Sequence, residues 1–63
     1  MLINIEDLVE FQYVKVEIIP LGEMTGQVTR IEKRDTVYKL TIKNSIEGSM
    51  YAFIKYGDKI IVT

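Results

Sequence analysis

The chain has 63 residues, neither cysteine nor histidine, and eight basic against nine acidic residues, which gives a net charge of -1. A domain this small buries only about 60% of the surface that its unfolded chain exposes. Without Cys or His, disulfides and soft-metal sites cannot add stability, and imidazole and thiolate catalysts are excluded. We expect one domain spanning residues 1–63, without catalytic residues, metal or cofactor, that is stabilised by self-association.

The near-neutral charge argues against a protein that coats nucleic acid through diffuse charge, but it leaves room for a focused basic site. No apolar run approaches the ~20 residues of a membrane span, and the start of the chain lacks the pattern of a signal peptide. The absence of Cys is compatible with a reducing compartment. We therefore expect a cytoplasmic protein with no membrane partner.

The first predicted element is a short amphipathic helix that begins at Asn4. Asn4 is a suitable N-cap, acidic residues follow it in the first turn, and Ile5, Leu8 and Val9 would share one helical face. About two turns of helix are unstable in isolation, so we expect this face to pack on the sheet that follows.

Five strands are predicted after the helix, mostly from alternation of apolar and polar residues, at about 14–18, 24–32, 38–43, 50–54 and 60–62. A turn around Pro20, extending to Gly22 and Glu23, separates the first two. The third strand has the clearest alternation, with Tyr38 at its start. We expect the strands to lie in the sheet in their chain order.

The second predicted strand breaks the strict alternation. Its apolar residues Val28 and Ile31 are an odd number of positions apart, and Gly26 lies just before them. A bulge or a strong bend would re-aim the later side chains and let a small sheet curl. We therefore expect Gly26 to serve the curvature.

The fourth and fifth predicted strands are apolar on both faces, so we expect both to be covered twice. Such strands near an open seam would pair with a neighbouring copy. Tyr13, Met50, Tyr51 and Phe53 could instead form a stacking platform, but we favour core and interface because the chain has few other large side chains. The interface candidates are Met50, Tyr51, Phe53, Ile60, Ile61 and Val62.

Two segments resemble the Sm-like family, which includes the Sm, LSm and Hfq proteins. The first motif of that family is matched in order by Val14, Val16, Gly22, Gly26, Val28, Ile31 and Glu32. The second is similar to Phe53–Val62, in which Ile54-Lys55-Tyr56-Gly57-Asp58 takes the place of the usual Ile-Arg-Gly-Asp, with Lys for Arg and one inserted Tyr. The resemblance implies a short N-terminal helix and a strongly bent five-stranded antiparallel sheet that forms a small open barrel.

The resemblance also implies a homo-oligomeric ring in which the fourth strand of one copy pairs with the fifth of the next. Loops around the pore of such a ring bind single-stranded RNA. Thr36 lies nearest to the position of the family's base-reading Asn, and Arg34 or Tyr38 stand in for the stacking group. The RNA-binding candidates are Arg34, Thr36, Tyr38, Lys55, Tyr56, Gly57 and Asp58.

Two alternatives remain open. The candidate residues could be ordinary polar loop residues, with Tyr38 half-buried on the core face. The chain could also be a structural or protein-interaction module with an SH3-like or KOW-type barrel, such as an accessory protein of a phage, that does not bind nucleic acid.

Overall fold

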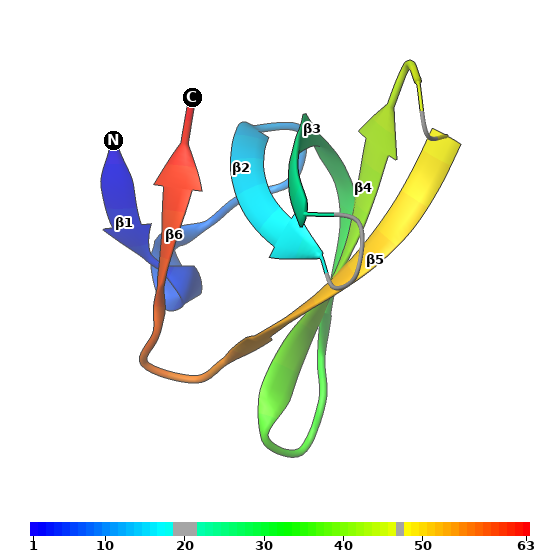
Figure 1. Cartoon of the computed structure of the whole chain (residues 1–63). Helices are drawn as coiled ribbons and strands as arrows, with labels where there is room; N and C mark the ends of the chain where they lie inside the picture. Colours follow the sequence, from blue (N-terminus) through cyan, green and yellow to red (C-terminus); the bar gives the residue numbers. More distant parts are fainter. Residues whose placement is uncertain (19–21, 47) are drawn as a thin grey trace.

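A computed structural model describes residues 1–18, 22–46 and 48–63. These residues form one antiparallel sheet of six strands in the order β1-β6-β2-β3-β4-β5 (Figure 1), which confirms the mainly β fold class. The turn predicted at Pro20 lies outside the described residues, whereas Gly22 and Glu23 already pair with β2. The strands are β1 (Leu2–Asn4), β2 (Tyr13–Ile18), β3 (Gly22–Lys33), β4 (Val37–Asn44), β5 (Gly48–Lys55) and β6 (Lys59–Val62).

The predicted N-terminal helix is wrong: a strand and a single 3-10 turn, η1 (Ile5–Asp7), take its place. Asn4 does not cap a helix because its backbone is extended and it pairs with Lys59 in the sheet. The N–H of Ile5 donates to the carbonyl of Asp58 at 2.9 Å. Pairing with the last strand thus satisfies backbone groups that a helix would have left open at its start.

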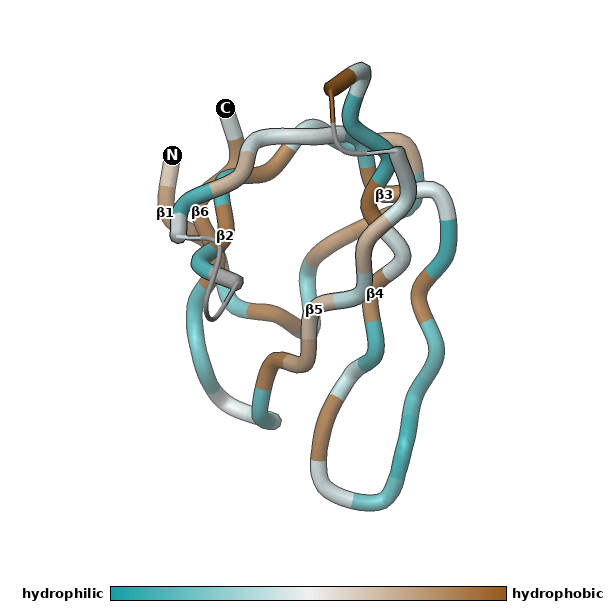
Figure 2. Tube along the Cα trace, turned by 45° about the vertical axis from the view of Figure 1, so that its right-hand side comes forward, coloured by the Kyte–Doolittle hydropathy of each residue, from teal (hydrophilic) through white to brown (hydrophobic). Residues whose placement is uncertain are grey.

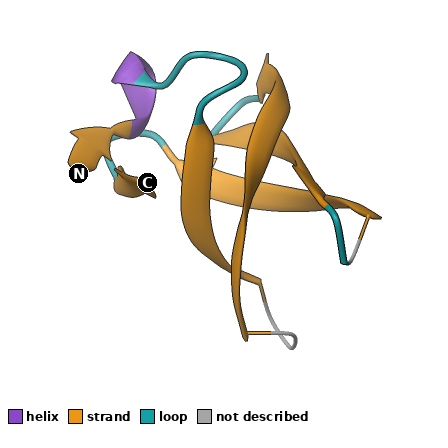
Figure 3. Ribbon diagram, turned by 90° about the horizontal axis from the view of Figure 1, so that it is seen from above, coloured by secondary structure: helices purple, strands orange, loops and turns teal. Residues whose placement is uncertain are grey.

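The core lies on the concave side of the curled sheet (Figure 3). Its described members are all apolar, and η1 and the residue after it supply two of them. The curl does not close the sheet into a barrel, because β1 and β5 stand at opposite ends of the strand order. The buried residues are Ile5, Leu8, Val14, Val16, Met24, Val28, Leu40, Ile42, Ala52 and Ile60.

The bulge predicted in the second strand is confirmed in β3. The register against β4 shifts between Val28 and Arg30, and Thr29 is the extra residue. The Thr29 hydroxyl donates to the Thr41 carbonyl at 3.3 Å. Val28 is fully buried and Ile31 packs against the same core, so the bulge reconciles two apolar residues of opposite parity with one core.

Gly26 has a more specific role than the curvature expected of it. A Cβ atom at this position would lie 2.6 Å from the carbonyl oxygen of Lys43 and 2.7 Å from Cγ2 of Ile42. Both distances are far below van der Waals contact. Gly26 therefore lets the backbone of β4 approach β3 closely, just before the bulge.

The predicted chain order is confirmed for the first four predicted strands, β2 to β5, but it is wrong for the last, and the free edges change with it. β6 pairs with β2 on one side and with β1 on the other, so the strand at 60–62 has no free edge. Figure 1 shows β1 and β6 side by side with both chain ends above them. The edges that remain free within the described sheet are those of β1 and β5.

Candidate nucleic-acid interface

Two turns distant in sequence meet at one end of the sheet: the β3–β4 hairpin and the turn between β5 and β6. The N–H of Tyr56 lies 3.5 Å from the Thr36 carbonyl oxygen. The rings of Tyr38 and Tyr56 pack edge to face, with centroids 4.9 Å apart and planes inclined by 64°. The sequence placed these residues in one site by resemblance, and the structure brings them together. We call Lys33, Arg34, Thr36, Tyr38, Lys55 and Tyr56 the loop cluster.

The loop cluster is rich in cations. The Lys33 ammonium lies 5.8 Å from the centroid of the Tyr56 ring, and Lys55 lies opposite Val37 on the adjoining strand. Arg34 is held by the hairpin, because its N–H donates to the Val37 carbonyl at 2.9 Å. Figure 2 shows that the end of this hairpin is mostly hydrophilic. Sequence patterns did not single out Lys33, which lies one residue outside the motif.

The two tyrosines of the loop cluster differ in exposure. Tyr38 is half-buried and packs against the core, as the alternative interpretation of the sequence had it. Tyr56 is 37% exposed, so part of its ring is free to contact a ligand. Of the two, Tyr56 is the ring that can stack on a base, while Tyr38 supports it from the side.

Gly57 and Asp58, two further RNA-binding candidates, hold the N-terminal segment through their backbones. Gly57 has φ +84, and its N–H donates to a carboxylate oxygen of Glu6 at 2.8 Å. The Asp58 carbonyl accepts from Ile5, and the Asp58 N–H donates to the Lys55 carbonyl at 3.1 Å. These contacts give both residues a structural task in the turn, and a contact with RNA stays a prediction.

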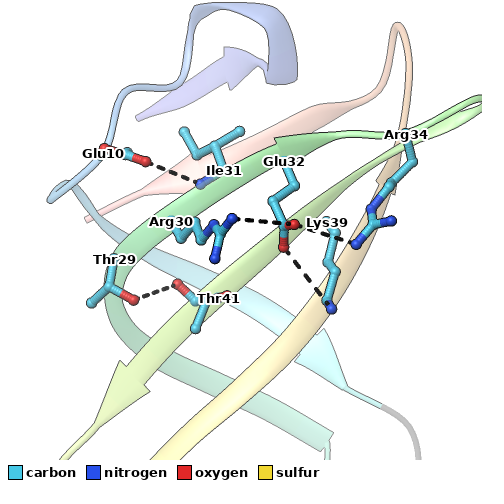
Figure 4. A network of polar contacts seen from close by, with 8 residues as sticks. All are labelled: Glu10, Thr29, Arg30, Ile31, Glu32, Arg34, Lys39 and Thr41. Carbon is cyan, nitrogen blue, oxygen red and sulfur yellow. Dashed lines mark hydrogen bonds and ion pairs between the residues drawn. The ribbon is translucent and has the colours of Figure 1, made fainter.

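A second polar arrangement covers the convex side of the sheet, centred on Glu32 (Figure 4). Its carboxylate receives Arg34 at 3.3 Å, Arg30 at 3.8 Å and Lys39 at 4.0 Å. Exposed ion pairs of this kind contribute little stability, about 0–1 kcal/mol each. Their consequence is local charge, because three cations share one carboxylate.

The same convex side carries exposed aromatic residues on β5. Tyr51 is 56% exposed and Phe53 is 61% exposed, although this strand was expected to be covered on both faces. The Lys39 ammonium lies 4.1 Å from the centroid of the Tyr51 ring. Met50, in contrast, packs against the core. We call Arg30, Glu32, Lys39, Thr41, Tyr51 and Phe53 the outer face.

The remaining interface candidates lie on β6, away from the outer face. Ile60 is buried in the core and Val62 packs against it, so both stabilise the single chain. Ile61 is 43% exposed and lies between Leu2 and Lys15 in the sheet. The β6 backbone is already paired on both sides, so the predicted pairing of this strand with a neighbouring copy would require β1 to detach.

A shallow groove of about 440 Å³ continues from the outer face towards β2. It is polar apart from Tyr13, which is 54% exposed. The Asn44 amide at one end donates to the Thr25 carbonyl at 2.5 Å and so joins two strands across the groove. The lining residues are Tyr13, Thr25, Gly26, Gln27, Lys43, Asn44 and Ser45.

Among the described residues, no three acidic side chains lie close enough together to hold a metal ion. Nor does any helix in residues 1–18, 22–46 or 48–63 have the length and apolarity to cross a membrane. Comparison with protein-family models, with curated proteins and with solved structures gave no match.

Proposed function

We propose that this chain is a non-catalytic module that binds single-stranded RNA at the loop cluster. The observation that carries the proposal is the Tyr38–Tyr56 ring pair, drawn from two turns that the fold brings together, with the Lys33 ammonium over the Tyr56 ring and with Arg34 and Lys55 at the same end of the sheet. Single-stranded nucleic acids are bound by rings that stack on bases and by cations that track the phosphates. The loop cluster offers both in one place.

Each group has a separate task in this proposal. Tyr56 stacks on an unpaired base through the exposed part of its ring. Lys33, whose ammonium lies over that ring, and Lys55, the residue before Tyr56, neutralise phosphates. Arg34 adds a planar guanidinium, which can bond a phosphate or stack. One copy has few contacts, so self-association would raise the affinity by presenting several clusters to one strand.

The test measures binding of fluorescein-labelled oligo-U and oligo-A, and of the corresponding DNA, by anisotropy at low and moderate salt. Tyr56→Ala is expected to weaken RNA binding by about five- to a hundredfold, as loss of one stacked base does. Tyr56→Phe keeps the ring and should bind almost as the parent does. Equal affinity of Tyr56→Ala and the parent would overturn the site.

Arg34→Ala in the same assay tests the charge component. Removal of one phosphate contact should weaken binding and reduce the slope of log K against log salt by about 0.7. Lys15→Ala is the matched control, since Lys15 lies on β2 beside Glu23 and outside the loop cluster. A slope that changes equally in both variants would point to diffuse attraction.

We also propose that copies of the chain associate through the free edge of β5 and the free edge of β1, in place of the β6 seam expected from the resemblance. The β1 end of the sheet carries the exposed apolar side chains of Leu2 and Ile61. An unpaired edge of eight residues is a ready template for strand addition. Such head-to-tail pairing closes into a ring or continues as a filament.

Light scattering at micromolar concentration checks this association. We expect a mass that is a multiple of the 7.3 kDa of one chain. Replacement of Leu2 by lysine places a charge beside the β1 edge and should lower the mass, while Ile46→Lys, at an exposed turn, should leave it unchanged. A parent protein of 7.3 kDa would exclude the oligomer.

A further inference from the structure

The outer face carries a second feature that suits a nucleic acid. β5 alternates strictly over its middle, so Ala52 lies buried opposite Leu40 while Tyr51 and Phe53 on either side of it are exposed. Residues two positions apart on a strand are separated by roughly 6.7 Å. Successive bases of a stacked strand lie roughly 3.4 Å apart. The spacing of the two rings is thus about twice that of stacked bases, which suits neighbouring bases that are splayed apart in an extended strand.

The surroundings of these rings are polar and basic. Thr41 lies opposite Tyr51, and Lys39 lies opposite Phe53. Lys39 also reaches over the Tyr51 ring, and Arg30 lies opposite Thr41 on β3, two strands away from the rings. The centres of protein interfaces are depleted in lysine. Exposed rings bordered by cations favour a partner with flat groups and negative charge.

The distribution of charge along the whole chain also favours an anionic partner for the outer face. Residues 24–63 hold seven of the eight basic residues against four acidic ones, whereas residues 1–23 hold one basic and five acidic residues. The net charge of -1 thus conceals a basic part, which includes most of β3 and all of β4, β5 and β6, and an acidic part, which includes β1 and β2. An anionic strand would be attracted to the outer face and repelled from the opposite end of the sheet.

The order of residues on β5 also favours nucleic-acid binding by the outer face. Tyr51-Ala52-Phe53-Ile54 has the aromatic, small, aromatic, aliphatic order found in the exposed strand of RNA-recognition sheets. The order is effective there because the small and aliphatic residues face the core while the rings face the ligand. The same division between core and solvent holds here, with Ala52 buried and Ile54 packed against the core.

We propose that Tyr51 and Phe53 form a stacking platform for two bases of a single-stranded nucleic acid, with Lys39 and Arg30 on its phosphates. The proposal rests on the function proposed above in its ligand class, and it adds a second binding segment. The bound strand passes from the loop cluster over the outer face. Glu32 limits the affinity of the outer face for the nucleic acid, because its carboxylate competes with phosphate for three cations.

The experiment uses labelled oligonucleotides of three and twelve nucleotides, RNA and DNA, in the anisotropy assay. Phe53→Ala and Tyr51→Ala should each weaken binding of the longer strand by about five- to a hundredfold. Ile46→Ala, at an apolar side chain on a turn that is 86% exposed, is the control and should bind as the parent does. Unchanged affinity of both aromatic variants would overturn the platform.

Two further variants have expected results that misfolding could not produce. Glu32→Gln releases the three cations and should tighten binding by about two- to fivefold at low salt, a gain that misfolding cannot produce. Phe53→Trp keeps a ring and introduces the sole tryptophan, whose emission should be quenched when a base stacks on it. A tryptophan emission that bound oligonucleotide does not change would contradict stacking.

The failures of the two proposals are distinguishable. If Tyr56→Ala weakens both strand lengths and the β5 variants change neither, the loop cluster binds and the platform is wrong. If only the β5 variants matter, the platform stands and the loop cluster fails. If the parent binds no oligonucleotide, both are wrong. If Phe53→Ala alters the scattering mass but not the affinity, the patch is an interface between copies and the platform is overturned.

Discussion

Replacing Gly26 with alanine is expected to remove a large part of the stability of this domain, although only one methyl group is added. That methyl would lie 2.6 Å from the Lys43 carbonyl oxygen and 2.7 Å from Cγ2 of Ile42. A side chain could rotate away, but the carbonyl belongs to the backbone of a central strand. Relief therefore requires the backbones of β3 and β4 to move apart beside Gly26.

The expected loss in the free energy of unfolding is about 3 kcal/mol, at the upper end of the range for overpacked sites. A chain of 63 residues has a total stability of roughly 3–9 kcal/mol. The variant should therefore be marginal or unfolded at 37 °C. Urea unfolding followed by circular dichroism measures the change, with the midpoint and the slope compared between variants.

Two controls separate steric conflict from other effects of the substitution. Thr25→Ala, at the exposed neighbouring position of β3, should change the stability by less than about 0.5 kcal/mol. Gly57→Ala meets open space but must adopt φ +84, so it should lose about 1 kcal/mol through backbone strain alone. A Gly26→Ala protein as stable as the parent would show that β3 and β4 do not approach this closely.

The strands that could be predicted from the sequence are those marked by alternation or by an apolar run between turn residues. The alternation from Tyr38 to Lys43 located β4, and the parity change between Val28 and Ile31 located the bulge. β1 could not be found this way, because three residues are too few to show a period. β6 pairs with β2 although the two strands are far apart in sequence, and local sequence patterns do not predict such pairings.

The candidate site could likewise be predicted from the sequence only in part. A resemblance of two short motifs was enough to place Thr36 and Tyr56 in one cluster, where a backbone contact joins them. The exposure of Phe53 could not be predicted, because an apolar run has the same sequence whether its second face is covered or open. Covering requires a partner element, and only the exposure of Tyr51 and Phe53 in the structure shows that the convex side of β5 has none within the described chain.

An alanine scan of the N-terminal segment should reproduce the periodicity of η1 and reject that of an α-helix. Ile5 is 2% exposed and Leu8 7% exposed, whereas Val9 is 59% exposed. Residues three apart share a side of a 3-10 turn, and here the Leu8 N–H donates to the Ile5 carbonyl at 3.2 Å. An α-helix would have buried Val9 as well, because positions i, i+3 and i+4 share its face.

Ile5→Ala and Leu8→Ala are therefore each expected to lower the free energy of unfolding by about 2–4 kcal/mol, since both leave a cavity against the sheet. Val9→Ala should change it by less than about 0.5 kcal/mol. Urea unfolding of the three variants gives the comparison directly. A large loss at Val9 would restore the helix predicted from the sequence, and small losses at all three positions would mean that the segment is not part of the core. The structure requires the first two residues to matter because η1 closes the concave side of the sheet that β1 and β6 leave open.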